Sequence, residues 1–277
     1  MSAAAMEAAR PLRKAGDTDA VTFSWADREA ERYGLVRVAT GAGASGEVSA
    51  SGLAIAFEGR EPIGAVAESG AVSVSTAVDV PLERWTVSGT GELSFSLTFE
   101  ALTPPAEYGG RSAYVKAGGL SGYEQICRVA GSVAGGRVRG LGQRGHAWGN
   151  PDWDRIALTR TVGAWFEDGG ALVSTVRGVK ASSHADEAVW AAVLDGSVAR
   201  SVSEARLSTT ADASGRQIRS GLELWVSDDD DYPERGIGSV VAGSTLELGA
   251  LRLDVAFFDW HVEGRPGVGR YDVIRRA

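Results

Sequence analysis

Twelve residues near the middle of this 277-residue chain bring together side chains that could do acid–base chemistry. The segment GQRGHAWGNPDW, residues 142–153, holds one of only three histidines and two of the eight tryptophans. The imidazole of His146 suits general acid or base work near neutral pH, and Asp152 is a nearby carboxylate. Trp148 and Trp153 offer wide apolar faces that can stack on a flat ligand or stabilise a cation. The segment is therefore a candidate active site.

The same segment also has a structural interpretation. Its glycines allow tight turns, its indoles can pack into a core, and His146 with Arg144 can satisfy buried carbonyl groups. The segment is too rich in glycine and polar residues to be typical of an ordinary strand or helix, which favours a corner of the fold. Spacing alone leaves both interpretations open.

Other patterns that could bind a cofactor or a metal are weak. GAGASG, residues 41–46, matches a dinucleotide-binding fingerprint, but the alternating segment after it predicts a strand where the fingerprint needs a helix. The acidic run at residues 228–231 lacks the spacing of a calcium loop and predicts a solvated loop. The histidines lack zinc-binding spacing, and Cys127 is the only cysteine. We expect no cofactor and no metal.

Strands are the elements that must position the central segment. In ELSFSLTFEAL, residues 92–102, apolar side chains alternate with polar ones, as in a half-buried strand. GLELWV, residues 221–226, and LRLDVAFF, residues 251–258, show the same period of two. Turn-forming pairs between such runs predict hairpins: Gly135-Gly136, Asp168-Gly169, Asp195-Gly196 and Ser214-Gly215. The only helix candidates are the N-terminal arm and WADREAERYG, residues 25–34, so the sequence predicts an all-β barrel or sandwich.

The overall composition argues against two classes of partner. The net charge is -8, and the lysines and arginines are scattered, so we expect no nucleic-acid partner. No apolar run approaches the ~20 residues of a membrane span, so no integral membrane segment is expected. The N-terminal residues lack the apolar core of an export signal, and a lone cysteine is compatible with a reducing compartment, which favours a cytoplasmic location. Composition does not indicate an oligomeric state.

The central segment resembles the G-x-R-D-H-S-W-G-x-R-D-W signature of the AttH and hydroxyneurosporene synthase (carotenoid hydratase) superfamily, in particular an uncharacterised branch of it. The likeness extends to YEQICRVAGSVAGGRVRGLGQRG before the signature, to ERWTVSGTGELSFSLTFEALTPP in the first half, and to EGRPGVGRYDV near the end. It covers most of residues 20–277. The resemblance implies two lipocalin-like (calycin) antiparallel β-barrel halves in tandem, with a flexible arm at 1–19, a first half at 20–140 and a second half at 141–277.

The resemblance also implies which residues form the site. Those carried over are Tyr123, Glu124, Gln125, Arg144, His146, Trp148, Gly149, Asp152 and Trp153. We expect His146 and Asp152 to be catalytic and the other polar and aromatic members to bind the ligand. Gly145 departs from the signature, which has an aspartate directly before the histidine, and Ala147 stands where it has a serine. The glycine removes a carboxylate that could donate a proton or orient the imidazole.

The function implied by the resemblance is the binding of a hydrophobic small molecule, isoprenoid-, sterol- or polyketide-like, in a β-barrel cavity. A cofactor-independent hydratase, or a cyclase or isomerase acting on a C=C bond, is the expected enzyme class. A non-catalytic lipid or terpenoid carrier is the alternative, and the missing aspartate favours it. A third interpretation is a structural module whose tryptophan-rich corner binds nothing.

Overall fold

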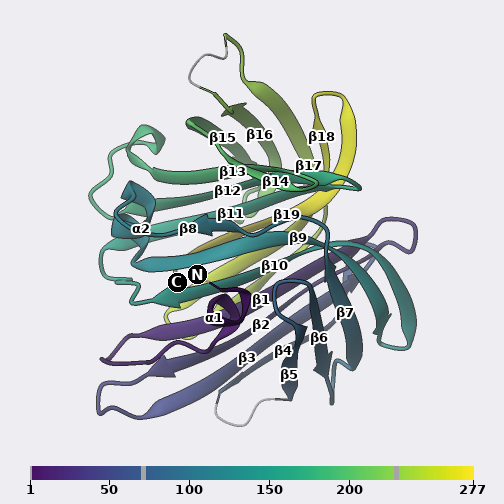
Figure 1. Ribbon diagram of the computed structural model, residues 1–277, viewed down its shortest axis with the longest axis vertical. Coiled ribbons are helices and arrows are strands. Elements are labelled where there is room, and N and C mark those ends of the chain that lie inside the picture. Colours follow the sequence, from purple (N-terminus) through teal and green to yellow (C-terminus); the bar gives the residue numbers. More distant parts are fainter. Residues whose placement is uncertain (1, 70–72, 228–230) are drawn as a thin grey trace.

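Two large antiparallel sheets, formed one after the other along the chain, make up nearly the whole protein (Figure 1). The computed structural model describes residues 2–69, 73–227 and 231–277. Each sheet curls into a half-barrel, so the prediction of an all-β fold with two lipocalin-like halves in tandem is confirmed. Of the acidic run at 228–231, all but Asp231 lies outside the described residues.

The first sheet has the strand order β4-β3-β2-β1-β10-β9-β7-β6-β5, and β8 pairs with β9. Its strands are β1 (Thr18–Asp27), β2 (Arg32–Ala42), β3 (Val48–Glu58), β4 (Glu61–Ser69), β5 (Val74–Val80), β6 (Arg84–Gly89), β7 (Phe95–Ala101), β8 (Ala106–Tyr108), β9 (Leu120–Val133) and β10 (Gly136–Gly149). GAGASG lies in the β2–β3 hairpin, as predicted. Strands β1 and β10 pair at the centre, which brings the start of the chain beside the central segment.

The second sheet has the order β14-β13-β12-β11-β19-β18-β17-β16-β15. Its strands are β11 (Ile156–Phe166), β12 (Gly169–Gly178), β13 (Ala188–Asp195), β14 (Val198–Ser201), β15 (Glu204–Ala211), β16 (Gln217–Trp225), β17 (Glu234–Leu248), β18 (Leu251–Val262) and β19 (Arg265–Arg276). The chain crosses between the sheets at residues 150–155.

Strand β10 contains most of the central segment, so residues 142–149 are a regular strand and not a corner. The strand is regular because β1 and β9 pair with it on both sides through Gly149. The division expected between residues 140 and 141 falls inside β10, whereas the structure keeps this strand in the first sheet.

Helices are few and short: α1 (Ala3–Glu7), α2 (Ala113–Gly118) and a 3-10 turn, η1 (His184–Asp186). In the part of the chain that the structure describes, no helix is long and apolar enough to cross a membrane. The helix predicted at residues 25–34 is wrong, since these residues end β1, turn, and begin β2. Trp25 pairs across this hairpin with Gly34, and an added side-chain carbon at Gly34 would lie 2.0 Å from the indole, so the two residues fit only as strand neighbours.

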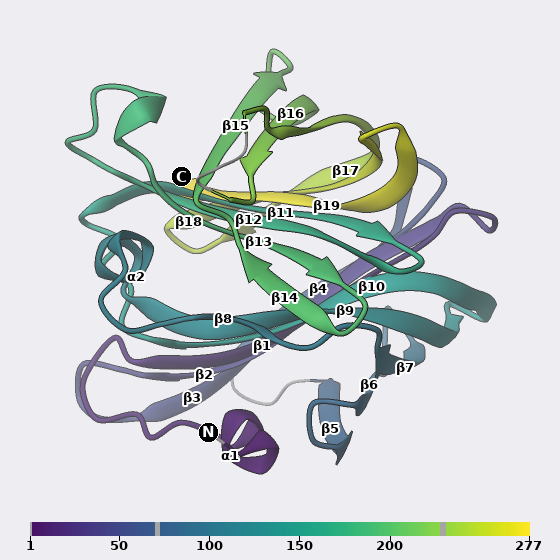
Figure 2. The ribbon, with the colours of Figure 1, turned by 45° about the horizontal axis from the view of Figure 1, so that its top comes forward.

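Three apolar clusters follow from the strand alternation. Trp25 and Phe99 belong to the cluster enclosed by the first sheet, and Phe258 belongs to the one enclosed by the second. Phe57 and Trp165 belong to the third cluster, which joins the facing surfaces of the two sheets. Figure 2 shows the two sheets as stacked layers with α2 at one end. Each strand in the middle of a sheet therefore has one face toward its own half-barrel and one toward the other sheet.

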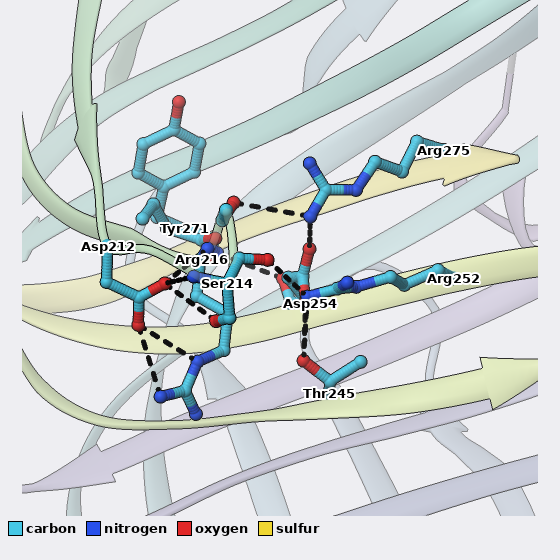
Figure 3. A network of polar contacts seen from close by, with 10 residues as sticks. Asp212, Ser214, Arg216, Thr245, Arg252, Asp254, Tyr271 and Arg275 are labelled. Atoms are coloured by element: carbon cyan, nitrogen blue, oxygen red, sulfur yellow. Dashed lines mark hydrogen bonds and ion pairs between the residues drawn. The ribbon is translucent and has the colours of Figure 1, made fainter. Parts of the chain in front are cut away.

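A polar network ties β17, β18 and β19 together in the second sheet (Figure 3). The buried carboxylate of Asp254 accepts hydrogen bonds from Thr245 Oγ1 at 2.6 Å, Arg252 Nε at 3.0 Å and Arg275 Nη2 at 2.7 Å. Nearby, Asp212 holds the β15–β16 turn by accepting from Ser214 Oγ at 2.6 Å. These charges are paired with one another, which indicates a structural role.

Candidate functional site

Strands β9 and β10 carry most of the residues that the sequence singles out, and they present them on two opposite faces. His146 pairs in register with Tyr123, and Gly145 with Glu124. Because successive side chains of a strand alternate, Tyr123 and His146 face the interior of the first half-barrel while Glu124 faces the second sheet. We call the first group the inner cluster (Tyr123, Arg144, His146 and Trp148). We call the second the intersheet cluster (Glu124, Gln143, Arg270 and Asp272).

In the inner cluster, both ring nitrogens of His146 have a hydrogen-bond partner. Nδ1 lies 3.0 Å from the carbonyl oxygen of Met6, and Nε2 lies 2.7 Å from Oδ1 of Asp19. A carbonyl oxygen only accepts, so Nδ1 carries a hydrogen. Burial raises the pKa of Asp19, but hydrogen bonds and charges from His146 and Arg10 outweigh it and leave the pKa below its ordinary value. Both ring nitrogens therefore have a hydrogen-bond partner within the chain, which fixes the ring and leaves neither nitrogen free to meet a ligand.

Arg144 is held in the same way by the start of the chain. Its guanidinium, which is 1% exposed, donates to the carboxylate of Glu7 and to the hydroxyl of Tyr123. Oε1 of Glu7 also accepts from Trp85 Nε1 at 2.9 Å and from the backbone N–H of Leu82 at 3.1 Å. The Arg144 guanidinium lies over the Trp85 ring at 4.9 Å. Glu7 is thus the shared acceptor of three donors, two from strands of the first sheet and one from the β5–β6 turn.

Residues 2–17, which we call the N-terminal segment, cover the inner cluster. The guanidinium of Arg10 lies 3.9 Å from the ring centroid of Trp148, and Trp148 meets His146 edge to face at 5.0 Å. Figure 2 shows α1 on the side of the first sheet that is turned away from the second sheet. The segment expected to be a flexible arm is therefore packed against the residues expected to bind a ligand.

The remaining sequence-predicted site residues lie apart from these contacts. Asp152 is exposed, and its carboxylate accepts the backbone N–H of Asp154 at 3.1 Å, so the carboxylate that meets His146 is Asp19 instead. Trp153 is partly exposed in the crossover between the sheets. Gln125 is buried and donates to the carbonyl oxygens of Thr103 and Leu82. The structure brings together Tyr123, Arg144, His146 and Trp148, and separates them from Glu124, Asp152 and Trp153.

The intersheet cluster links both halves of the protein. Gln143 donates to Oε2 of Glu124 at 2.7 Å and accepts from Trp165 Nε1 at 3.0 Å. Arg270, on β19, lies 3.7 Å from the carboxylate of Glu124 and 3.3 Å from that of Asp272. Within the described chain, Nε of Arg270 and Oδ1 of Asp272 are buried without a hydrogen-bond partner. Buried polar atoms are nearly always satisfied, and two of those that are not belong to this ion pair.

The charges of the intersheet cluster do not balance when every group is ionised, because two carboxylates share one guanidinium. Burial raises the pKa of Asp272 to about 6, against the favourable charge of Arg270 and with the added repulsion of Glu124. Asp272 is thus a carboxyl group that keeps its proton to a higher pH than an ordinary aspartate. Such a group can serve as a general acid.

Aromatic rings cover this cluster on one side. Tyr108, on β8, lies 5.0 Å from Trp190 of β13 and 5.5 Å from Tyr114 of α2, measured between ring centroids. Burial raises the pKa of the Tyr114 hydroxyl to about 12. These rings combine apolar faces with hydroxyl groups that stay protonated, a lining suited to an apolar molecule with a few polar atoms.

Gly145 makes room for the carboxylate of Glu124. A side-chain carbon at this position would lie 2.5 Å from both carboxylate oxygens of Glu124. The position that lacks the signature aspartate is therefore filled by a carboxylate from the neighbouring strand. An aspartate at 145 would bring two carboxylates into contact.

We predict that Gly145→Ala displaces the Glu124 carboxylate from Gln143 and lowers the free energy of unfolding by about 1–3 kcal/mol. Urea titration followed by tryptophan fluorescence measures the change. Gly41→Ala is the matched control, since its added carbon meets nothing closer than 3.8 Å. Equal unfolding midpoints for the two variants would contradict the contact between Glu124 and residue 145.

Sequence reasoning missed Arg270 and Asp272. A signal was present, because the strand GVGRYDV places two charges at alternate positions in an otherwise apolar run. In a strand with both faces covered, alternate charges point to the same buried surface. What the sequence lacked was the identity of the facing strand, which supplies Glu124, 146 residues before Arg270 in the chain.

Two clefts in the described part of the chain lie away from both clusters. One of about 1240 Å³ lies beside the β1–β2 and β11–β12 turns and is lined mainly by charged residues: Asp27, Arg28, Glu29, Asp79, Arg84, Glu100, Arg128, Arg139 and Glu167. A second, of about 400 Å³, lies against β17. Neither is lined by His146. Across the described ranges, no group of three His, Cys, Asp or Glu side chains is arranged to hold a metal ion.

Solved structures show where this fold occurs. An AttH candidate from Nitrosomonas europaea is 11% identical, with a TM-score of 0.67 and 97% of each chain covered. Kievitone hydratase from Nectria haematococca is 10% identical (TM-score 0.61), and CghA with Sch210972 is 11% identical (TM-score 0.62). Each of these two covers 95% of this chain and 89% of its own. No curated protein sequence matches significantly.

These similarities confirm the AttH-like fold that the central segment predicted. They hold across both halves, because the coverage of this chain is nearly complete. At the level of sequence, residues 4–276 match one family model, and the chain therefore belongs to the family described as "Domain of unknown function (DUF7064)".

Proposed function

We propose that this protein binds a largely apolar small molecule between its two sheets and transfers a proton to it without a cofactor. The observation that best supports the proposal is the intersheet cluster, in which Glu124 and Asp272 share the guanidinium of Arg270 in a buried setting. An isoprenoid-, sterol- or polyketide-like molecule suits the neighbouring aromatic rings.

The chemistry is acid-catalysed addition to a carbon–carbon double bond. Asp272 gives its proton to one alkene carbon, and the indole of Trp190 stabilises the cation that forms. Water adds its oxygen to the other carbon and loses a proton to Glu124, so that the product has gained one water. Proton return from Glu124 to Asp272 restores the site. Where water is excluded, loss of a neighbouring proton gives an isomer, and attack by a second double bond closes a ring.

The fold adds support by analogy. Kievitone hydratase is by its name a hydratase and shares the fold over nearly its whole length. Fold alone does not transfer an activity, so the carboxyl pair of Glu124 and Asp272 is the main support for catalysis. The catalytic role expected of His146 and Asp152 stays a prediction. The hydrogen bonds of His146 to Met6 and Asp19 instead favour a role in fastening the N-terminal segment.

A non-catalytic carrier is the second candidate function. Arg270 lies 3.7 Å from the carboxylate of Glu124 and 3.3 Å from that of Asp272. These three charged side chains are sufficient to bind a polar group of a ligand without any reaction. The absence of the signature aspartate at Gly145 favours the same interpretation.

The test is incubation of the purified protein with isoprenoid, sterol, unsaturated fatty-acid and polyketide candidates in ¹⁸O-labelled water, followed by mass spectrometry of the extracts. We expect a labelled adduct, or an isomer of unchanged mass, from the wild type and from His146→Asn. We expect neither from Asp272→Asn or Glu124→Gln. Asp195→Asn, which changes an exposed residue at the end of β13, is the control and should behave as wild type.

Two outcomes would contradict the proposed chemistry. Compounds retained by the protein but returned unchanged would support the carrier. Turnover that survives both carboxyl substitutions but is lost in a folded His146→Asn variant would move the reaction to the inner cluster.

A further inference from the structure

The N-terminal segment is attached to the first sheet by side chains rather than by strand pairing. Among the described residues, no backbone-to-backbone hydrogen bond joins residues 2–15 to a strand. The first such bond runs from the N–H of Gly16 to the carbonyl oxygen of Ala42 at 2.9 Å. Within the segment, α1 has only five residues, and a helix of one turn is not stable by itself. The segment can therefore separate from the sheet at Gly16 without disturbing any strand.

The carboxylate of Glu7 lies in a site that is built by the rest of the chain. Its three donors are the guanidinium of Arg144, Trp85 Nε1 at 2.9 Å and the N–H of Leu82 at 3.1 Å. The side chains of Glu7 and Arg144 are 4% and 1% exposed. The guanidinium lies over the rings of Trp85 and Tyr123, each at 4.9 Å. A buried guanidinium with further N–H donors is suited to bind a carboxylate, and all these groups remain when the segment leaves.

The backbone donor of this site is held in place independently of Glu7. Leu82 has a φ of 62°, a left-handed conformation that is rare for a residue with a side chain. Gln125, on β9, donates to the carbonyl oxygen of Leu82 at 3.1 Å and so ties the turn to the sheet. Strained backbone that its surroundings fix in this way is typical of ligand-binding sites.

Glu7 uses the guanidinium of Arg144 incompletely. A carboxylate pairs best with a guanidinium through two parallel N–H groups. Glu7 accepts from Nη2 of Arg144, while Nη1 donates to Tyr123. In the part of the chain that the structure describes, Nε of Arg144 is buried without an acceptor. A carboxylate that is not tethered to α1 can turn to accept from Nε as well, which adds a hydrogen bond that Glu7 does not make.

Met6 places an apolar group next to this carboxylate. In residues 2–17 it is the one buried residue, with 4% of its surface exposed. Its carbonyl oxygen meets Nδ1 of His146 at 3.0 Å, so Met6 and Glu7 both enter the inner cluster. The segment therefore presents one apolar side chain beside one carboxylate to the first sheet, which is the pattern of an apolar carboxylic acid.

We propose that the inner cluster is a second binding site, selective for an apolar monocarboxylic acid. Met6 and Glu7 occupy this site until such an acid displaces residues 2–15. Displacement alone leaves the guanidinium of Arg144 buried without a counter-ion, which is strongly unfavourable. A ligand carboxylate in the place of Glu7 keeps the guanidinium paired, so binding and displacement occur together. The site lies on the opposite face of β9 and β10 from that of the proposed function, and the inference does not depend on that function.

Limited trypsin digestion of the wild type tests the displacement. Hexanoic, octanoic and decanoic acid are each compared with the alcohol of the same length, and the fragments are identified by mass spectrometry. The bond after Lys14 is restrained while the segment is bound, because Asp17 accepts the N–H of Lys14 and Asn150 donates to the carbonyl oxygen of Ala15. We expect at least one acid to speed cleavage there roughly 10-fold or more, and the alcohols to leave it unchanged. Lys180, in an exposed turn after β12, is the internal control and should be cleaved at a constant rate.

A rescue experiment tests the recognition of the carboxylate. Glu7→Ala lacks this group, so acetate, compared with chloride at equal ionic strength, should raise its melting temperature by roughly 2–4 °C. Glu7→Ala/Arg144→Met should show no response to acetate. Glu100→Ala, which breaks an exposed ion pair, is the control for a general effect of acetate and should show none either.

The proposal is overturned if no acid accelerates cleavage after Lys14, or if the alcohols accelerate it as much as the acids. Acceleration that occurs equally after Lys180 would indicate general unfolding and would also overturn it. A folded Glu7→Ala protein that does not respond to acetate would contradict the carboxylate site. Because the digestion uses the wild type, a Glu7→Ala protein that fails to fold leaves the proposal testable.

Discussion

Replacing Glu7 by alanine should lower the free energy of unfolding by about 3–5 kcal/mol, because it leaves the buried guanidinium of Arg144 without its counter-ion. The side chains of this pair are 1% and 4% exposed, so water cannot replace the lost carboxylate. The substitution also removes the acceptor for Trp85 Nε1 and for the backbone N–H of Leu82. Urea titration followed by circular dichroism measures the change.

Two further variants separate this ion pair from a general effect of charge. Glu100→Ala breaks the Arg84–Glu100 pair, whose side chains are about half exposed, and should cost no more than about 1 kcal/mol. The double variant Glu7→Ala/Arg144→Met should recover much of the loss, because it leaves no buried charge unpaired. A Glu7→Ala protein as stable as Glu100→Ala would show that the N-terminal segment does not depend on Arg144.

The strands were predictable where the sequence alternates between solvent and core. The patterns at 92–102, 221–226 and 251–258 correspond to β7, β16 and β18, and the predicted turns join β9 to β10, β11 to β12, β13 to β14 and β15 to β16. Such signals are local, because a strand with one covered face records its own environment. The pattern 25–34 misled because a short charged stretch between Trp25 and Tyr33 has the spacing of a helix but forms a hairpin.

The candidate site was predictable only in part, because its partners are distant in the sequence. The resemblance singled out Arg144 and His146, but nothing local indicates that Glu7 and Asp19 complete their contacts. The sequence also could not show that β10 divides its residues between two faces with different neighbours. Adjacent residues such as Tyr123 and Glu124 therefore appear as one site in the sequence and belong to two clusters in the structure.

Replacing Asp272 by asparagine should stabilise the protein at neutral pH and remove a pH dependence of the wild type. The folded-state pKa of Asp272 is raised from 3.8 to about 6. Between these values the folded protein binds more protons than the unfolded chain, so the stability contributed by this group falls as the pH rises from 4 to 6. Above pH 6 the deprotonated carboxyl costs up to about 3 kcal/mol, since each pKa unit corresponds to about 1.4 kcal/mol.

Urea unfolding at pH 4, 5, 6 and 7 checks this expectation. Asp272→Asn and wild type should differ least at pH 4, and the variant should be more stable by about 2–3 kcal/mol at pH 7. Asp195→Asn should follow the wild type at every pH. If the free energies of unfolding of Asp272→Asn and wild type differ by the same amount at every pH, the group that stays protonated in the folded protein is not Asp272. If the variant is both more stable and inactive, Asp272 is held at a cost in stability, as expected of a group kept for chemistry rather than for folding.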